Sequence, residues 1–257
     1  MGALERRLRS LRDGGGKAFV PYVTGGYPGV DAELLRAIQD AGADAIEVGI
    51  PHSDPIMDGG VIQQASARAL QEGATPADVL ATIRRAALTI PVVVMTYANP
   101  VERRGEAPFL DDLVQAGVAG AIVPDLPVDE AGGFDETATA RGIDAVLLAA
   151  PGTAPERLAR IATTAHGFVY CVATYGVTGA RDQLEGTARQ LVESLRPLTD
   201  LPLLVGVGIT SPEQAADACV FADGVIVGSA LMSLLLNGEH DGALALAASF
   251  REALARG

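Results

Sequence analysis

The chain has 257 residues, 49% of them hydrophobic, and a formal net charge of −13. A nucleic-acid-binding domain needs a basic face, so this charge argues against that class of partner. No apolar run approaches the roughly 18 residues of a membrane helix, and the charged amino-terminal sequence lacks the apolar core of a secretion signal. We therefore expect a soluble cytoplasmic protein whose excess of acidic residues serves solubility.

The predicted elements begin with a helix over Ala3–Arg12. Eight short apolar runs rich in valine and isoleucine follow, each with the composition of a strand buried on both faces. The predicted strands are Ala18–Thr24, Ala45–Gly49, Pro91–Tyr97, Ala119–Val123, Ile143–Ala149, Gly167–Val172, Leu203–Gly206 and Asp223–Val227.

Helical patterns lie between these runs. The segments "DAELLRAIQDAGA", "FLDDLVQAGVA" and "SPEQAADACVFA" place apolar residues three and four positions apart, as an amphipathic helix does. In the last of them, Ser211 has the character of an N-cap and Pro212 stands at the first helical position.

Eight strand–helix units in a chain of this length predict a (β/α)8 TIM barrel. The extra amino-terminal helix should cap its lower end, and no linker divides the chain, so we expect one domain over residues 1–257. A doubly wound open sheet is the alternative. An open sheet of this kind does not require eight strand–helix units. It usually has the sequence GxGxxG after its first strand, where this chain has "TGGYPG".

The second predicted strand, within "AIEVG", carries a carboxylate at Glu47. A carboxylate in the helix layer is costly without a partner, so we expect Glu47 to face the barrel mouth. Partial burial there would raise its pKa toward that of an acid/base catalyst. Considered alone, a strand glutamate is as often a member of a structural ion pair.

Small residues follow the last two strands, in "GVGIT" and "GSA", and a helix is expected to start after Gly228. Exposed amides and a helix amino terminus form the phosphate site of many such barrels, whereas the alternative is that these glycines only make tight turns. The segment "ATYGVTGAR", residues 173–181, has the glycine-hinged composition of a lid or, alternatively, of a plain surface loop.

These motifs together resemble one known family. "IEVGIPHSDPIMDG" resembles the signature of the tryptophan synthase alpha chain family, and "GVTGAR" resembles its loop after strand 6. "FVPYVTGGYP", "MTYANP", "VPDLPVDE" and "FADGVIVGSAL" fit the same family in the same order, over almost the full chain. The resemblance implies a lyase that cleaves indole-3-glycerol phosphate to indole and glyceraldehyde 3-phosphate by a retro-aldol reaction, with no cofactor and no metal.

The resemblance also implies roles for individual residues. Glu47 is expected to be the acid/base at indole C3, and Asp58 to accept a hydrogen bond from the indole N–H. Asp54 and Pro55 are expected to face a beta chain in a heterotetramer. The residues implied in substrate binding are Tyr22, Tyr97, Asp125, Tyr170, Thr178, Gly179, Gly208, Gly228 and Ser229, of which Thr178 belongs to the lid.

The chain departs from the family pattern near the lid and the partner loop. Met57 stands where a small residue is common, Gly60 replaces a common proline, and Thr174-Tyr175 replaces an Arg-Ser pair. The two carboxylates are unaffected, so the expected chemistry is the same. Partnership with a beta chain and a free-standing indole-3-glycerol phosphate lyase of specialised indole metabolism both stay open.

Other mechanisms lack the residues they need. A Schiff-base aldolase needs a lysine at the barrel mouth, but Lys17 is the single lysine and precedes the first strand. Of the three histidines, only His52 is expected near the mouth, which makes no metal site there. Sugar-phosphate isomerases of this fold resemble paired-aspartate enzymes, with acids at strands 1 and 5, where this chain has Thr24 and Ala149. A catalytically idle regulatory subunit would not need to retain both carboxylates.

Overall fold

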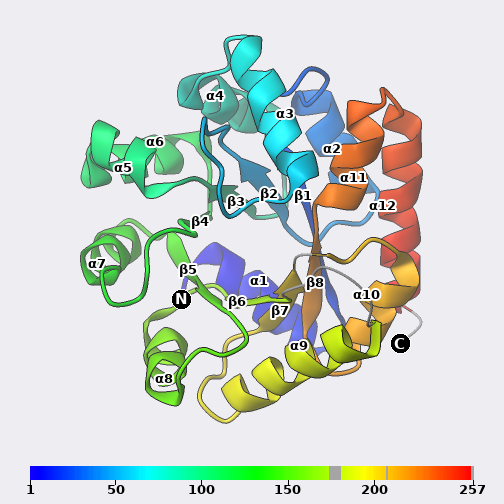
Figure 1. The fold of residues 1–257 in the computed structure, drawn as a ribbon. Coiled ribbons are helices and arrows are strands. Elements are labelled where there is room, and N and C mark those ends of the chain that lie inside the picture. Colours follow the sequence, from blue (N-terminus) through cyan, green and yellow to red (C-terminus); the bar gives the residue numbers. More distant parts are fainter. Residues whose placement is uncertain (174–180, 207, 256–257) are drawn as a thin grey trace.

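Eight parallel strands close into a barrel in chain order, and β1 pairs with β8 to complete the ring (Figure 1). The structure, a computed structural model, describes residues 1–173, 181–206 and 208–255. The strands are β1 Ala18–Thr24, β2 Ile46–Gly49, β3 Val92–Met95, β4 Gly120–Ile122, β5 Asp144–Ala149, β6 Val169–Val172, β7 Leu203–Gly206 and β8 Gly224–Val227. The predicted TIM barrel is confirmed.

Helices surround this ring of strands, except that α1 lies across one end of it (Figure 1). They are α1 Ala3–Asp13, α2 Ala32–Asp40, α3 Gly60–Gln71, α4 Pro76–Ala86, α5 Ala98–Arg104, α6 Glu106–Ala116, α7 Gly132–Ala140, α8 Pro155–Thr164, α9 Arg181–Leu195, α10 Pro212–Cys219, α11 Ser229–Leu236 and α12 His240–Ala255. In the part of the chain that the structure describes, no helix is both long and apolar enough to cross a membrane.

The bounds of the strands and helices agree with those predicted from the sequence to within a few residues. The first and seventh strands have the predicted ends, and Ser211 caps α10 through a capping box with Gln214. The third strand was predicted too long, because it ends at Met95 and Tyr97 is the N-cap of α5. The β-branched and aromatic run "VVVMTY" continues past the point where the backbone leaves the barrel.

The barrel interior is a cluster of apolar side chains that includes Val20, Val93 and Leu204. Leu4 and Leu8 of α1 belong to the same cluster and are almost fully buried. The extra helix therefore closes the amino-terminal end of the barrel, as the sequence predicts, and Figure 1 shows it across the middle of the ring.

Asp44, which precedes β2, fastens that closed end. It is 4% exposed, accepts a hydrogen bond from the Phe19 amide at 3.0 Å, and pairs with Arg7 of α1 and Arg251 of α12, each at 2.9 Å. One carboxylate thus joins the first strand, the first helix and the last helix. The chemistry predicted from the sequence lies at the opposite end.

Candidate active site

Glu47 lies on β2 beside Tyr22 of β1 and Val93 of β3. Paired positions on neighbouring strands face the same side of a sheet, and Val93 belongs to the interior cluster, so Glu47 faces into the barrel. The residue is 2% exposed, and its Oε2 atom is buried without a hydrogen-bond partner among the described residues. Burial, and secondarily the charge of Asp58, raises the pKa of Glu47 to about 8.

Asp58 lies on the loop between β2 and α3. Its amide donates to the Pro55 carbonyl at 3.0 Å, and the Gln63 side chain donates to its carbonyl at 2.9 Å. The Tyr97 hydroxyl donates to its carboxylate at 3.1 Å and accepts from the Met57 amide at 3.0 Å. Burial raises the pKa of Asp58 to about 6, against the lowering effect of the Tyr97 hydrogen bond.

The two carboxyl groups therefore differ in protonation near pH 7. Glu47, with a pKa of about 8, holds its proton, whereas Asp58, with a pKa of about 6, is ionised. Two interacting groups whose surroundings separate their pKa values in this way supply an acid and an anion to the same site. The arrangement can protonate a substrate and stabilise the positive charge that results.

Two buried tyrosines pack their hydroxyl groups against glycines at the ends of strands. A Cβ atom on Gly49 would lie 2.2 Å from the Tyr22 hydroxyl, and one on Gly206 would lie 2.3 Å from the Tyr170 hydroxyl. Any larger residue at either glycine would displace the ring. Burial raises the pKa of both tyrosines, so each presents a neutral hydroxyl to the interior.

His52 completes the aromatic part of the site. Its ring stacks on Tyr97, with centroids 4.6 Å apart and an interplanar angle of 17°. The sequence placed His52 near the mouth without a role. The stacking fixes the ring whose hydroxyl holds Asp58, and no local motif signals it, because the two residues are far apart in the chain.

Three of the predicted phosphate-site residues are described. Gly208 has a φ of +88°, Gly228 is the N-cap of α11, and Ser229 begins that helix. The first hydrogen bond of α11 runs from the Met232 amide to the Gly228 carbonyl at 3.0 Å, so the amides before it have no acceptor within the helix. A Cβ on Gly59 would lie 3.9 Å from the Ser229 hydroxyl, which places the Asp58 loop beside this helix start.

Other predicted residues lie elsewhere. Thr178 and Gly179 are outside the described residues. Asp125 is exposed and accepts a hydrogen bond from the Ala98 amide at 2.8 Å, so it holds the start of α5 just after Tyr97.

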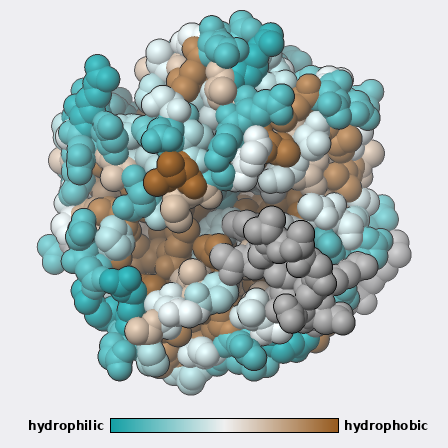
Figure 2. All heavy atoms as spheres, viewed as in Figure 1, coloured by the Kyte–Doolittle hydropathy of each residue, from teal (hydrophilic) through white to brown (hydrophobic). Residues whose placement is uncertain are grey.

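The predicted partner loop lies on the surface. Asp54 is exposed, and the apolar side chains of Ile56 and Met57, next to Pro55, are 70% and 54% exposed. Seen from the same side as Figure 1, the surface is hollowed near its centre, with hydrophobic residues gathered toward β4 and β5 (Figure 2). A cavity of about 940 Å³ lies between α4 and α6, and His52 is among the residues that line it, whereas Glu47 and Asp58 are not.

Comparison with known proteins gives one consistent answer. A family model described as tryptophan synthase alpha chain matches residues 8–253. The tryptophan synthase alpha chain of Halorhodospira halophila is 44% identical over 259 residues, which cover 99% of this chain and 94% of that protein. That of Streptomyces avermitilis is 44% identical over 244 residues, with 93% and 88% covered.

Solved structures agree with the sequence relatives. Tryptophan synthase subunit alpha from Legionella pneumophila superposes with a TM-score of 0.90 at 34% identity, covering 100% of this chain and 99% of that one. A chain of Mycobacterium tuberculosis tryptophan synthase gives 0.90 at 39% identity, with 98% of each chain covered. A family match over nearly all of the sequence, with this agreement in fold, shows that the chain belongs to the tryptophan synthase alpha chain family.

Proposed function

We propose that this chain cleaves indole-3-glycerol phosphate to indole and glyceraldehyde 3-phosphate, the reaction of its family, with Glu47 and Asp58 as the catalytic pair. The supporting observation is the buried, unpaired Oε2 of Glu47 beside an ionised Asp58. Native proteins rarely leave a buried oxygen without a partner, so such an atom is well placed to act on a substrate.

The reaction balances with these two groups alone. Asp58 accepts a hydrogen bond from the indole N–H, and the Glu47 carboxylic acid donates its proton to indole C3. The positive charge on the ring is stabilised by the Asp58 carboxylate. Glu47, now a carboxylate, removes the proton from the hydroxyl next to the scissile bond. The carbon–carbon bond breaks, its electrons return to the ring, an aldehyde forms, and Glu47 is protonated again.

The remaining site residues position the substrate in this proposal. Tyr22 and Tyr170 line the space around Glu47, and the phosphate lies on the amides at Gly208, Gly228 and Ser229, where the start of α11 contributes its positive dipole end. The family resemblance assigns Gly179 to the phosphate site and Thr178 to the lid, and both residues lie outside the described part of the chain. Tyr97 acts through Asp58, to which it donates a hydrogen bond, whereas Asp125 holds the start of α5 just after Tyr97.

Two substitutions test the catalytic assignment. Glu47→Gln keeps the shape of the side chain but cannot transfer a proton, so indole formation should fall below detection. Asp58→Asn should lower kcat by a factor on the order of 10²–10⁴, since it removes a positioned charge. Steady-state assays of indole release measure both rates.

A matched control separates chemistry from folding. Glu72→Gln makes the same change at an exposed ion pair with Arg68 and should leave the rate unchanged. A near-normal rate in either catalytic variant would refute the assignment. An inactive parent chain with normal folding would instead support a regulatory subunit.

We further propose that the chain acts with a beta chain through the loop at Asp54 and Pro55. The exposed apolar side chains of Ile56 and Met57 support this, because an apolar surface beside a catalytic loop suits docking of a partner. A free-standing lyase is the alternative that the departures at Met57, Gly60 and Thr174-Tyr175 leave open. The rate in the presence of a beta chain distinguishes the two.

A further inference from the structure

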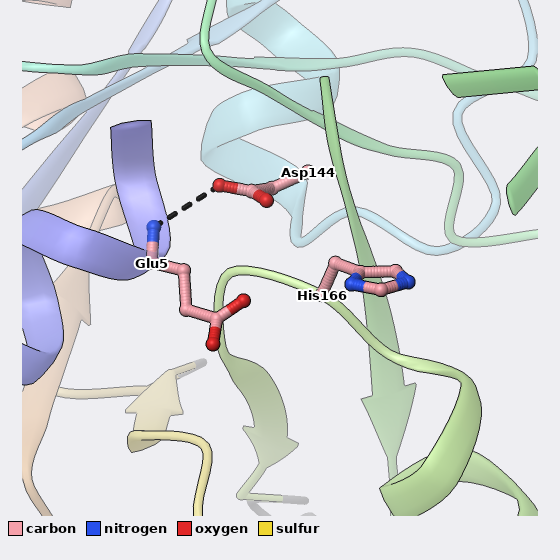
Figure 3. A group of neighbouring side chains, drawn as sticks. All are labelled: Glu5, Asp144 and His166. Carbon is pink, nitrogen blue, oxygen red and sulfur yellow. Dashed lines mark hydrogen bonds between the residues drawn. The ribbon is translucent and has the colours of Figure 1, made fainter. Parts of the chain in front are cut away.

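Three potential metal ligands meet at the amino-terminal end of the barrel, away from the active site (Figure 3). Glu5 comes from the first turn of α1, Asp144 begins β5, and His166 lies between α8 and β6. One ligand atom from each lies within 4.8 Å of those of the other two. Glu5 is 7% exposed and Asp144 is 3% exposed, whereas the His166 side chain is 33% exposed and leaves a route from solvent.

The orientation of His166 suits a ligand. Figure 3 shows one ring nitrogen turned toward the Glu5 side and the other turned away. The Nε2 atom lies 3.3 Å from Oδ1 of Asp135, a buried oxygen with no hydrogen bond to the described residues. A metal-bound histidine usually directs its second nitrogen to a carboxylate in this way.

Negative charge exceeds positive charge around the cluster. Glu5 and Asp144 are carboxylates, Asp135 adds a third beside His166, and Arg9 pairs with Glu5 at 2.7 Å. Each Asp144 oxygen accepts only one backbone amide, from Gly2 at 3.1 Å and from Glu5 at 3.0 Å, so lone pairs stay available on both.

We propose that Glu5, Asp144 and His166 form a site for a divalent metal of the Zn²⁺ class, with Asp135 orienting the imidazole. One nitrogen and two carboxylates are ligands that Zn²⁺ accepts, whereas Mg²⁺ and Ca²⁺ prefer oxygen alone. Zinc bonds of about 2.0–2.2 Å in tetrahedral geometry hold ligand atoms about 3.4 Å apart, so the ligand atoms need to approach by about 1.4 Å at most. Rotation of the partly exposed His166 ring provides part of that movement.

The proposed metal would fasten α1 to the barrel, since its ligands come from α1, β5 and the turn before β6. It has no role in the cleavage reaction, which takes place at the other end. Loading should therefore raise the melting temperature by several degrees and slow amide hydrogen exchange in residues 3–13, while leaving kcat unchanged.

Titration of the chelator-treated full chain with Zn²⁺ tests the site. Calorimetry should give one ion per chain, and Co²⁺ should give a visible absorption spectrum of low coordination number. Mg²⁺ at the same concentration should give neither the heat nor the rise in melting temperature. No saturable Zn²⁺ binding, or binding without protection of residues 3–13, would overturn the proposal.

Variants locate the bound ion. His166→Phe removes the nitrogen ligand and Glu5→Gln removes one carboxylate while keeping its shape, so each should weaken Zn²⁺ binding by at least about tenfold. His240→Gln removes a histidine outside the cluster and should bind like the parent chain. Equal Zn²⁺ affinity in His166→Phe and the parent chain, or loss in His240→Gln, would overturn the assignment.

Discussion

Glu47 keeps a proton at pH values at which an exposed glutamate would lose it. The contribution of this residue to folding stability therefore depends on pH. Its pKa rises from an ordinary value of 4.5 to about 8 in the folded chain, so the folded state binds the proton more tightly than the unfolded state. Between these two values the folded chain loses about 1.4 kcal/mol of stability for each unit of rising pH through this group.

Glu47→Gln should remove that loss. We expect the variant to gain stability relative to the parent chain as pH rises from 5 to 8.5, because its amide does not titrate. Urea unfolding of both chains at several pH values in this range measures the difference in unfolding free energy. A difference that is constant with pH would show that Glu47 titrates normally.

The pKa of Asp58 is raised by burial and lowered, to a smaller extent, by the hydrogen bond from Tyr97. The rate constant kcat/KM should rise as Asp58 ionises near pH 6 and fall as Glu47 ionises near pH 8, because the proposed mechanism needs the first group charged and the second neutral. Tyr97→Phe removes a hydrogen bond that lowers the pKa of Asp58. The rise of kcat/KM on the acidic side of the pH profile should therefore move to higher pH.

The pH profile of kcat/KM for the two chains measures this shift. Tyr27→Phe is a suitable control, because Tyr27 donates to the Leu235 carbonyl at 3.5 Å outside the carboxylate pair. The control should show the rise and the fall of kcat/KM at the same pH values as the parent chain. A rise that stays at the same pH in Tyr97→Phe would mean that another group determines the pKa of Asp58.

At the scale of elements, local pattern predicts where strands exist better than where they end. The eight β-branched runs all form strands, because each is apolar on both faces. The end of β3 was missed because the Asp125 carboxylate, from a loop well downstream, holds the Ala98 amide and starts α5. A contact between distant segments of the chain leaves no trace in the local sequence.

The candidate site was also predicted in part from the sequence. Glu47 could be placed in the mouth from alternation along its strand and the cost of burying a charge. The hydrogen bond from Tyr97 to Asp58 and the stacking of His52 on Tyr97 depend on how the β2–α3 loop meets the end of β3. Residue types and motif order therefore indicate the members of the site, whereas the fold assigns their contacts.

Asp44 shows how one residue stabilises several elements. Asp44→Asn weakens two ion pairs that hold α1 and α12 to the barrel, and it should lower the free energy of unfolding by about 2–3 kcal/mol. This is below the 3–5 kcal/mol of a fully buried pair, because Arg7 and Arg251 are partly exposed. Asp13→Asn, at an exposed pair with Arg12, should change stability by less than about 1 kcal/mol.

Urea unfolding compares these variants, and kcat at a temperature well below the melting transition checks that the active site is unaffected. Equal stability of Asp44→Asn and Asp13→Asn would show that the amino-terminal end does not depend on this carboxylate.

At the scale of the whole molecule, the residues that stabilise the fold and the residues of the candidate site lie at opposite ends of the barrel. Leu4, Leu8 and Asp44 close the amino-terminal end, where substitutions should affect unfolding. Glu47 and Asp58 lie at the other end, where an unpaired buried oxygen is retained at a cost to stability. The loop at Asp54 and Met57 connects that end to the surface, so a partner that docks there would act directly on the position of Asp58.

Docking of a beta chain should therefore raise the rate of indole formation. Ordering of the Asp58 loop by a partner would favour the position of Asp58 that the reaction needs, and a typical coupling free energy between two sites of about 1–3 kcal/mol corresponds to a factor of about 5–150. The measurement is kcat of the chain alone and beside a saturating beta chain. Strong activation supports the subunit proposal, whereas an unchanged and already fast rate means that the chain works alone.

A pair of surface variants locates the contact. Ile56→Asp places a charge on the 70% exposed apolar side chain of the partner loop, so it should abolish activation and leave the rate of the isolated chain unchanged. Val220→Asp makes the same change at a 74% exposed valine near the end of α10, away from this loop, and should retain activation. Activation that survives in Ile56→Asp, or is lost in Val220→Asp, would place the partner on another face of the barrel.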